Sequence, residues 1–189
     1  METLRTHLAG VTILTPKINH DHRGYFLEKY NEKTLEALGI PPLRVQENES
    51  YSKKYVLRGL HFQLKKPQAK LVRVTQGEIL DVVADVTPHS PTYRKWVMVK
   101  LDRRKKEMLY IPVGYAHGFL VLTRTATVEY AVDEFYSGRD DQCGVRWDDP
   151  DLAINWPEGI EPILSKEDRD RPLLRDLSPE NLPKVLALS

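Results

Sequence analysis

The chain of 189 residues contains one cysteine, Cys143, which excludes an internal disulfide framework. No apolar run approaches the ~20 residues of a membrane span. The opening residues, Met-Glu-Thr-Leu-Arg-Thr-His, also lack the apolar stretch of a signal peptide. With 28 Lys and Arg against 27 Asp and Glu, a net charge of +1 provides no overall field for nucleic acid. These absences predict a cytoplasmic protein with neither a membrane nor a nucleic acid as partner.

Several common catalytic motifs are missing too. The glycine-rich phosphate loops GxGxxG and GxxxxGK[ST] do not occur, nor do GxSxG, CxxC and HExxH. Their absence argues against the usual nucleotide-loop, serine hydrolase, dithiol redox and zinc protease classes. The composition, 41% hydrophobic and 29% charged, is that of an ordinary globular protein.

Short segments rich in β-branched and aromatic residues recur along the chain, separated by Gly, Pro, Asn and Asp. This spacing predicts an all-β barrel or sandwich. The segment Ile79–Val86 is almost continuously apolar, so we expect it to lie between two packed layers. The expected strands are Val11–Leu14, Tyr25–Tyr30, Leu43–Gln46, Val56–Phe62, Leu71–Thr75, Ile79–Val86, Trp96–Leu101, Met108–Ile111, Phe119–Leu122 and Thr127–Val132.

Two short helices are expected. The first covers about Glu32–Leu38, with Asn31 as its N-cap and Gly39 beyond its end. The second starts at Ser165, with Asp168 at the fourth position as in a capping box. After about residue 150 the strand pattern disappears, so we expect one domain, residues 1–189, with a C-terminal extension wrapped over it.

The segment around His61 has the highest density of polar residues. Alternation along a strand places His61 on one face and Arg58 on the other, although a bulge at Gly59 could re-aim both. A lone histidine in a strand is usually a satisfied core residue. Here Arg58, Gln63 and Lys70 lie close by in sequence, and such a polar cluster favours a ligand.

Two further residues have alternative interpretations. Lys70 is either a solvated strand-edge lysine or a cation in a cleft, held by Asp81 or Asp85, that stabilises an oxyanion. His117 ends a Pro-x-Gly-x-x-His pattern that resembles the second motif of cupin barrels, where a histidine often binds metal. The matching first motif offers only His61, so we expect no metal and assign His117 to substrate binding or support.

Aromatic and basic residues complete the candidate site. A tyrosine such as Tyr130, facing a cleft, can donate a proton because it is neutral at pH 7. Tyr136 can stack on a planar ring. Arg23, Arg58 and Lys70 form the kind of set that clamps a pyrophosphate.

These motifs closely resemble the dTDP-4-dehydrorhamnose 3,5-epimerase family, from about Val11 to Leu174. The resemblance implies a cupin-like jelly-roll barrel, a homodimer, and no metal or organic cofactor. It implies inversion of carbons 3 and 5 of dTDP-4-keto-6-deoxyglucose, giving dTDP-4-keto-L-rhamnose. The matching segments are Asp21–Glu28, Gln46–Asn48, Val56–Gln63, Lys70–Arg73, Ile111–Phe119, Arg146–Asp151 and Leu164–Asp168.

The resemblance also implies residue roles. His61 matches the base, Asp168 the carboxylate paired with it, Tyr130 the general acid, and Lys70 the group beside the keto oxygen. Tyr136 matches the aromatic that stacks on thymine. The remaining positions that match substrate contacts are Arg23, Phe26, Glu28, Gln46, Asn48, Arg58 and His117.

Two departures from the family keep alternatives open. Ala131 follows Tyr130 where many members have lysine, and the loop Ser137–Gln142 differs in length and charge. A mono-epimerase that inverts only carbon 3 or carbon 5 of a related 4-keto nucleotide sugar is therefore one alternative. A non-catalytic sugar-nucleotide-binding cupin is another, and a metal-dependent cupin enzyme is disfavoured by the missing ligands.

Overall fold

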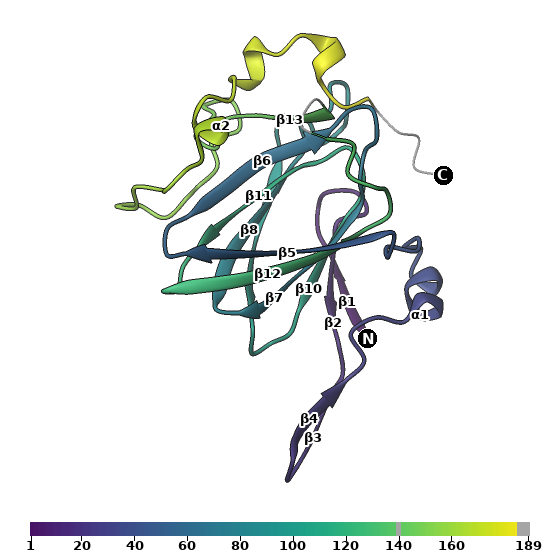
Figure 1. The fold of residues 1–189 in the computed structure, drawn as a ribbon. Helices are drawn as coiled ribbons and strands as arrows, with labels where there is room; N and C mark the ends of the chain where they lie inside the picture. The colour runs from purple at the N-terminus through teal and green to yellow at the C-terminus, as the bar shows by residue number, and fades with distance from the viewer. Residues whose placement is uncertain (139–140, 185–189) are drawn as a thin grey trace.

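A computed structural model describes residues 1–138 and 141–184 as two facing antiparallel sheets (Figure 1). The architecture confirms the predicted all-β jelly roll. The six-stranded sheet has the order β1 (Glu2–Arg5), β2 (Thr12–Thr15), β10 (Met108–Ile111), β7 (Lys70–Gln76), β12 (Thr125–Val132) and β5 (Gln46–Lys53). The five-stranded sheet has the order β13 (Gln142–Gly144), β6 (Leu57–Gln63), β11 (Ala116–Val121), β8 (Glu78–Ala84) and β9 (Trp96–Asp102).

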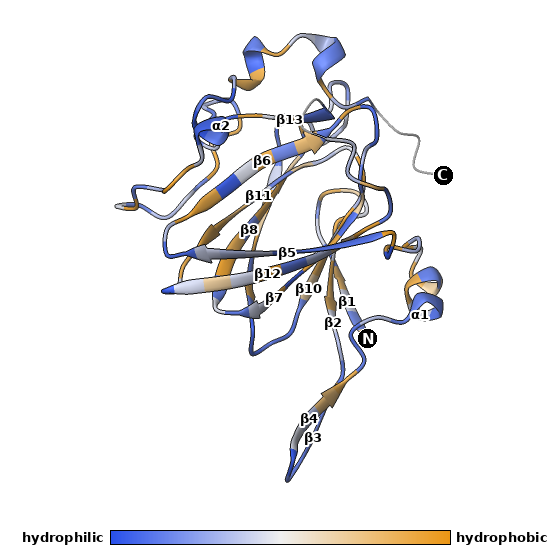
Figure 2. Cartoon of the chain, viewed as in Figure 1, coloured by the Kyte–Doolittle hydropathy of each residue, from blue (hydrophilic) through white to orange (hydrophobic). Residues whose placement is uncertain are grey.

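The main core fills one part of the space between the sheets. Val72 and Val128 of the six-stranded sheet pack with Val83 and Val121 of the five-stranded sheet, all at most 1% exposed. Figure 2 shows the apolar residues concentrated in the strands, whereas α2 and many loops are hydrophilic. Strand β8 is apolar on both faces because residues such as Val82 point the other way, toward the C-terminal segment. The expectation for Ile79–Val86 is thus confirmed.

The two expected helices are present. Helix α1 (Glu32–Ala37) begins after Asn31, whose side chain accepts a hydrogen bond from the Thr34 N–H at 3.3 Å. Helix α2 (Lys166–Arg169) begins after Ser165, which accepts from the Asp168 N–H at 3.0 Å. Two 3-10 turns follow, η2 (Leu174–Asp176) and η3 (Pro179–Asn181). None of the helices in residues 1–138 and 141–184 has the length and apolar composition needed to cross a bilayer.

The C-terminal segment covers the outer face of the five-stranded sheet. Leu152, Leu174 and Leu182 pack there against Leu60 and Phe62 of β6. This packing brings α2 to the edge of β6 (Figure 1). A carboxylate of the C-terminal segment can therefore reach the strand that carries His61.

Several strands differ from the expectation. The expected strand Leu43–Gln46 is wrong, because β5 only begins at Gln46. Its sequence, QENESYSK, is polar on both faces, so an apolar pattern could not reveal it. Strands β1 and β13, and β3 (Ile18–Asp21), which pairs with β4 (Gly24–Leu27), were also missed. They are short and mostly exposed or half-buried, which removes the hydrophobic signal.

Candidate active site

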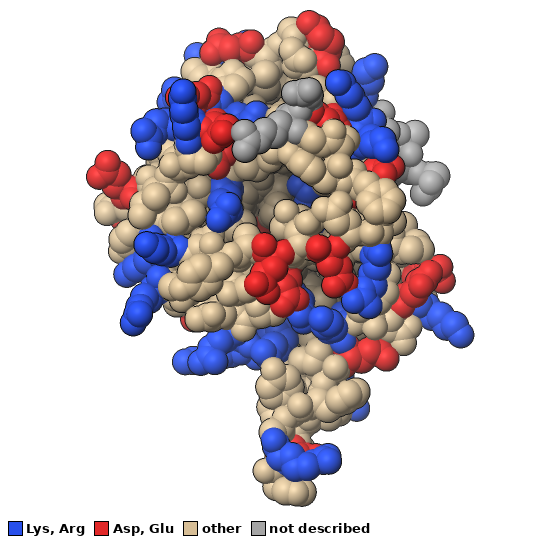
Figure 3. Space-filling view, in the orientation of Figure 1, with Lys and Arg blue, Asp and Glu red and all other residues tan. Residues whose placement is uncertain are grey.

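A cavity of about 770 Å³ lies beside the core, between the two sheets and the C-terminal segment. Figure 3 shows a deep hollow on the face of the molecule drawn there, with basic side chains at its edge. The polar face of β5 lines the cavity, which explains the missing apolar pattern of that strand. The cavity brings together nine of the predicted residues, namely Gln46, Asn48, Arg58, His61, Lys70, His117, Tyr130, Tyr136 and Asp168.

Strand β6 presents both Arg58 and His61 to this cavity. Simple alternation, which separates them onto two faces, is wrong here because the pairing with β11 shifts between His117 and Phe119. Gly59 has φ +108°, and a Cβ there would lie 2.6 Å from the His117 carbonyl oxygen. Only glycine fits this close approach. The bulge considered from the sequence therefore re-aims the two polar side chains.

His61 and Asp168 form the first of two histidine–aspartate pairs. The His61 Nε2 atom is hydrogen-bonded to Asp168 Oδ1, so Nδ1 remains as the nitrogen that can take a proton. The side chains are 22% and 6% exposed. Burial lowers the pKa of His61 below its ordinary value, although the Asp168 carboxylate opposes this shift. His61 is therefore a neutral base near pH 7.

Asp168 remains ionised in this pair. Burial alone would raise the pKa of Asp168, but hydrogen bonding with His61 and Ser165 outweighs it, and the pKa lies below its usual value. An ionised carboxylate orients the imidazole and stabilises its protonated form. The pair thus has the features of a general base with its positioning residue.

Lys70 and the second pair, His117 with Asp81, lie deeper. The His117 Nε2 atom is 2.9 and 3.0 Å from the two Asp81 oxygens. Lys70 is 8% exposed, and burial lowers its pKa to about 8 while the charge of Asp81 opposes this shift. Of the two carboxylates considered for Lys70, Asp81 is thus the one that acts on it. Asp85 instead binds the loop that follows β8, for example Thr92 Oγ1 at 2.6 Å.

Tyr130 faces the same cavity from β12. Burial raises the pKa of Tyr130, although the Arg58 charge opposes this, so the phenol keeps its proton at neutral pH. Tyr136 is 47% exposed at the cavity wall. Its backbone N–H donates to Gln46 Oε1 at 3.0 Å, and Gln46 donates in turn to Asn48 Oδ1 at 2.7 Å. A reactive hydroxyl and an aromatic platform thus share one cavity.

Three predicted substrate contacts are outside this cavity. Arg23 lies in the turn of the β3–β4 hairpin, Phe26 lies in β4, and Glu28 follows that strand. The hairpin projects from the body at the end away from α2 (Figure 1). Arg23 pairs with Asp21 at 2.6 Å, and Phe26 is 72% exposed. Within one chain, the structure does not bring these residues to His61.

Ala131 does not line this cavity either. It lies on the opposite face of β12 from Tyr130 and packs beside α1. A lysine at this position would therefore point away from the cavity of its own chain. Of the divergent loop, residues 139 and 140 lie outside the described residues, while Asp141 accepts backbone N–H groups of Leu64, Lys65 and Lys66.

Three residues that line the cavity, Ser50, Gln68 and Arg171, were not predicted as site residues from the sequence. Ser50 and Gln68 reach the cavity from polar strand and loop positions that carry no motif. Arg171 lies three residues after Asp168 and lines the cavity beside Gln142. The only signal in the sequence was proximity to Asp168, since the contact with β13 depends on how the C-terminal segment folds back.

The described residues contain no group of three or more His, Cys, Asp and Glu side chains arranged to hold a metal ion. His61 and His117 face each other in the β6–β11 register, but each is engaged by its own aspartate. The absence of a metal requirement remains a prediction.

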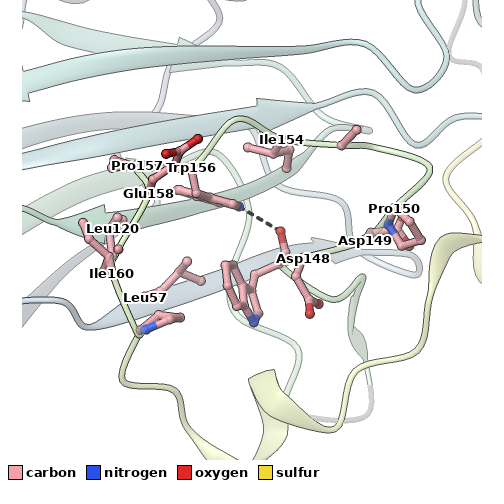
Figure 4. A pocket seen from close by; sticks show the side chains of 14 residues that line it. Leu57, Leu120, Asp148, Asp149, Pro150, Ile154, Trp156, Pro157, Glu158 and Ile160 are labelled. Atoms are coloured by element: carbon pink, nitrogen blue, oxygen red, sulfur yellow. Dashed lines mark hydrogen bonds between the residues drawn. The ribbon is translucent and has the colours of Figure 1, made fainter.

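A second cavity, of about 350 Å³, lies under the C-terminal segment (Figure 4). Trp147, Trp156 and Leu57 line it, and the Trp156 indole donates to the Trp147 carbonyl at 2.8 Å. Among the described residues that line it there is no Lys, Arg or His. Its charged side chains are carboxylates, those of Asp148, Asp149 and Glu158, so it offers no counter-charge for an anion.

The chain is similar to known proteins in both sequence and fold. The family model described as dTDP-4-dehydrorhamnose 3,5-epimerase matches residues 5–176. The dTDP-4-dehydrorhamnose 3,5-epimerase of Methanothermobacter thermautotrophicus is 45% identical over 92% of this chain and 94% of its own. That of Escherichia coli K12 is 45% identical over 89% and 91%. The Legionella pneumophila dTDP-6-deoxy-D-glucose-3,5-epimerase, solved with dTDP-4-keto-L-rhamnose, superposes with TM-score 0.94 at 40% identity, covering 98% and 99%.

Proposed function

The chain belongs to the dTDP-4-dehydrorhamnose 3,5-epimerase family, and from this premise we propose how its cavity inverts carbons 3 and 5 of dTDP-4-keto-6-deoxyglucose. The ketone at carbon 4 acidifies both neighbouring C–H bonds. Each inversion is then a proton removal followed by a proton return on the opposite face, giving dTDP-4-keto-L-rhamnose. Since both steps are proton transfers, the reaction needs no redox cofactor.

His61 is the base in this proposal. Its Nδ1 atom takes the proton from the carbon, and the electrons of the C–H bond form the carbon–carbon double bond of an enolate. Asp168, bound to Nε2, stabilises the imidazolium that results. The lowered pKa of His61 supports this role because the neutral imidazole is the form that can accept a proton at pH 7.

Lys70 stabilises the enolate oxygen. The carbon acid is much weaker than imidazolium, so proton removal needs strong stabilisation of the negative charge that develops on oxygen. Lys70 is buried in the cavity, and with a pKa of about 8 its ammonium form predominates at neutral pH. A charge in a water-poor site acts more strongly than one in bulk solvent.

Tyr130 is the acid. Its phenol donates a proton to the carbon on the face opposite His61, the enolate returns to the ketone, and the configuration is inverted. The raised pKa of Tyr130 supports this role because the hydroxyl stays protonated at neutral pH and is therefore available to protonate the enolate carbon. Exchange with solvent then returns His61 and Tyr130 to their starting states before the second carbon reacts.

The nucleotide occupies the opening of the cavity. Tyr136 stacks on the thymine, and the hydrogen bond of its backbone to Gln46 supports this placement. Arg58, held by Ser52 at 3.0 Å, faces the diphosphate. Asn48 and His117 contact the nucleotide sugar along the cavity wall.

A homodimer would complete the site. We propose that the β3–β4 hairpin of one protomer supplies Arg23, Phe26 and Glu28 to its partner's cavity, since these residues cannot reach the cavity of their own chain. The 72% exposure of Phe26 supports a role outside the isolated chain. Mixing inactive His61→Asn and Phe26→Ala proteins, after subunit exchange, should restore activity through mixed dimers. No restoration, with a monomer by light scattering, would refute this arrangement.

We propose a cytoplasmic location. The single cysteine, Cys143, is a free thiol, which a reducing compartment maintains. Fractionation that recovered the active enzyme outside the cytoplasm would contradict this placement.

The observation that carries the proposal is one cavity holding a histidine paired to a carboxylate, a buried lysine and a tyrosine. The test is to incubate the protein with dTDP-4-keto-6-deoxyglucose and determine the product configuration by NMR. Inversion at carbons 3 and 5 is expected. Inversion at one carbon would identify a mono-epimerase, and no conversion despite binding would identify a binding protein.

A further inference from the structure

Arg171 has an unusual position in the catalytic cavity. It follows helix α2, and its Nη1 donates to the Gln142 carbonyl on β13 at 3.0 Å. Its Nε is buried and has no hydrogen-bond partner among the described residues. Buried donors are almost always paired in proteins, and Arg171 also lines the cavity, so its guanidinium has hydrogen-bonding capacity that the described residues leave unused.

The surrounding structure makes room for this guanidinium. A Cβ at Gly144 would lie 3.1 Å from Arg171 Nε and 3.3 Å from Cδ, so a larger residue there would displace the side chain. Gly144 pairs with His61 across β13 and β6, which places Arg171 next to the catalytic pair. The Arg171 charge accordingly contributes to lowering the pKa of His61.

The cavity needs such a cation for a diphosphate. The diphosphate of a nucleotide sugar carries two negative charges, while Glu167, Asp168 and Asp170 add acidic groups to the wall. Lys70 lies deep and beside Asp81, and Arg23 would come only from the hairpin of the other protomer in the proposed homodimer. Among the described residues that line the cavity, the guanidinium groups are those of Arg58 and Arg171.

We infer that Arg171 binds the diphosphate of the nucleotide sugar together with Arg58. The two side chains enter from different edges of the cavity, because Arg58 is held by Ser52 on β5 and Arg171 by Gln142 on β13. A planar guanidinium can form parallel bonds to phosphate oxygens, and that of Arg171 lines the cavity with its Nη1 fixed by the Gln142 carbonyl. This inference rests on the proposed function, since it assumes a nucleotide diphosphate in the cavity.

The test compares calorimetric binding of dTDP and of thymidine to the full-length protein and to Arg171→Gln. The expected result is dTDP binding about 10- to 100-fold weaker, as for loss of a charge-assisted hydrogen bond, with thymidine binding unchanged. Arg169→Gln is the matched control, because it removes the same charge from an exposed position at the end of α2, two residues before Arg171. Arg171→Lys should recover part of the lost affinity.

Unchanged dTDP affinity in Arg171→Gln, or equal weakening of dTDP and thymidine, would overturn the inference. The second result would mean that Arg171 only holds β13 in place through Gln142. In either case, normal dTDP binding by the unaltered protein would leave the proposed function standing. An unaltered protein that binds neither ligand would overturn the proposed function and this inference with it.

Discussion

The two histidine–aspartate pairs use the same side chains in different surroundings. His61 and His117 stand opposite each other on β6 and β11. Asp168 reaches His61 from a helix 107 residues away in sequence, and His61 is 22% exposed. Asp81 reaches His117 from the adjacent strand β8, and these side chains are 0% and 11% exposed. One pair opens toward the cavity and the other is almost closed.

This difference in exposure assigns different roles to the two pairs: the His61 pair transfers protons, and the His117 pair supports Lys70. A base must meet a carbon acid, so it needs an open nitrogen, and the His61 pair leaves Nδ1 for that purpose. The His117 pair keeps a carboxylate next to Lys70, where it sustains the charge of that lysine. A histidine–aspartate contact alone therefore does not identify a catalytic base, because the histidine also needs access to the substrate.

The largest expected effect is the loss of His61. We expect His61→Asn to lower activity by about 10²–10⁴-fold or more, because no other neutral base can replace it. His117→Asn is the matched comparison and should retain more activity, with its effect in the KM and the pH profile. Steady-state kinetics on folded variants check this. Equal losses of activity in the two variants would contradict the different roles assigned to the two pairs.

Tyr130→Phe should follow in size. Phenylalanine keeps the ring and removes only the hydroxyl, so we expect about 10²-fold or greater loss of inverted product with little change in Tm. Tyr136→Phe should change product formation little, since stacking survives without the hydroxyl. If Tyr136→Phe is the damaging variant, the roles of the two tyrosines are exchanged.

Asp168→Asn tests the open pair through its pH dependence. The activity of the unaltered enzyme should rise with pH as His61 loses its proton, with a midpoint below the ordinary histidine pKa of about 6.5. Because Asp168 raises the pKa of His61, its removal should lower kcat/KM and move this limb to still lower pH. Asp176→Asn removes the same charge at an exposed site and should leave the limb in place. An acid limb that moves to higher pH would contradict the assignment of Asp168 as the partner of His61.

Asp81→Asn tests the closed pair at the alkaline end. Activity should fall above pH 8, because Lys70, with a pKa of about 8, loses the charge that stabilises the enolate. Asp81 raises the pKa of Lys70, so its removal should move the alkaline limb below 8. The measurement is kcat/KM against pH on variants that keep their Tm. An alkaline limb that stays at the same pH would show that Asp81 does not raise the pKa of Lys70.

The smallest expected effect is that of chelation. His61 and His117 are both engaged by aspartates, and the reaction is a pair of proton transfers. We expect full activity after EDTA treatment and no stoichiometric metal by elemental analysis. Loss of activity that one metal restores would assign His61 and His117 to a metal centre instead.

Much of the site could be predicted from sequence because its residues fall in ordered motifs. His61, Lys70, Tyr130 and Asp168 meet in one cavity as the family resemblance implies. The caps of both helices could also be predicted, since the side chains of Asn31 and Ser165 each accept a hydrogen bond from the backbone N–H three residues later. Local chemistry of this kind depends little on the rest of the fold.

Other features depend on contacts distant in sequence. The polar strand β5 has no apolar signal because it faces a cavity rather than the core. The face of Arg58 depends on the approach of Gly118 to Gly59 from another strand. The position of Arg171 depends on how the C-terminal segment packs on β6 and β13. A local sequence pattern cannot predict these contacts, because each joins segments that are distant in the sequence.

Solvent deuterium exchange tests the central claim, a base and an acid on opposite faces of the sugar, most directly. The protein variants are incubated with dTDP-4-keto-6-deoxyglucose in D₂O, and carbons 3 and 5 are followed by NMR. His61→Asn should incorporate no deuterium at either carbon. Tyr130→Phe should still incorporate deuterium at carbon 3 or carbon 5 while yielding little inverted product. Wild-type exchange in His61→Asn, or normal inversion in Tyr130→Phe, would contradict the account.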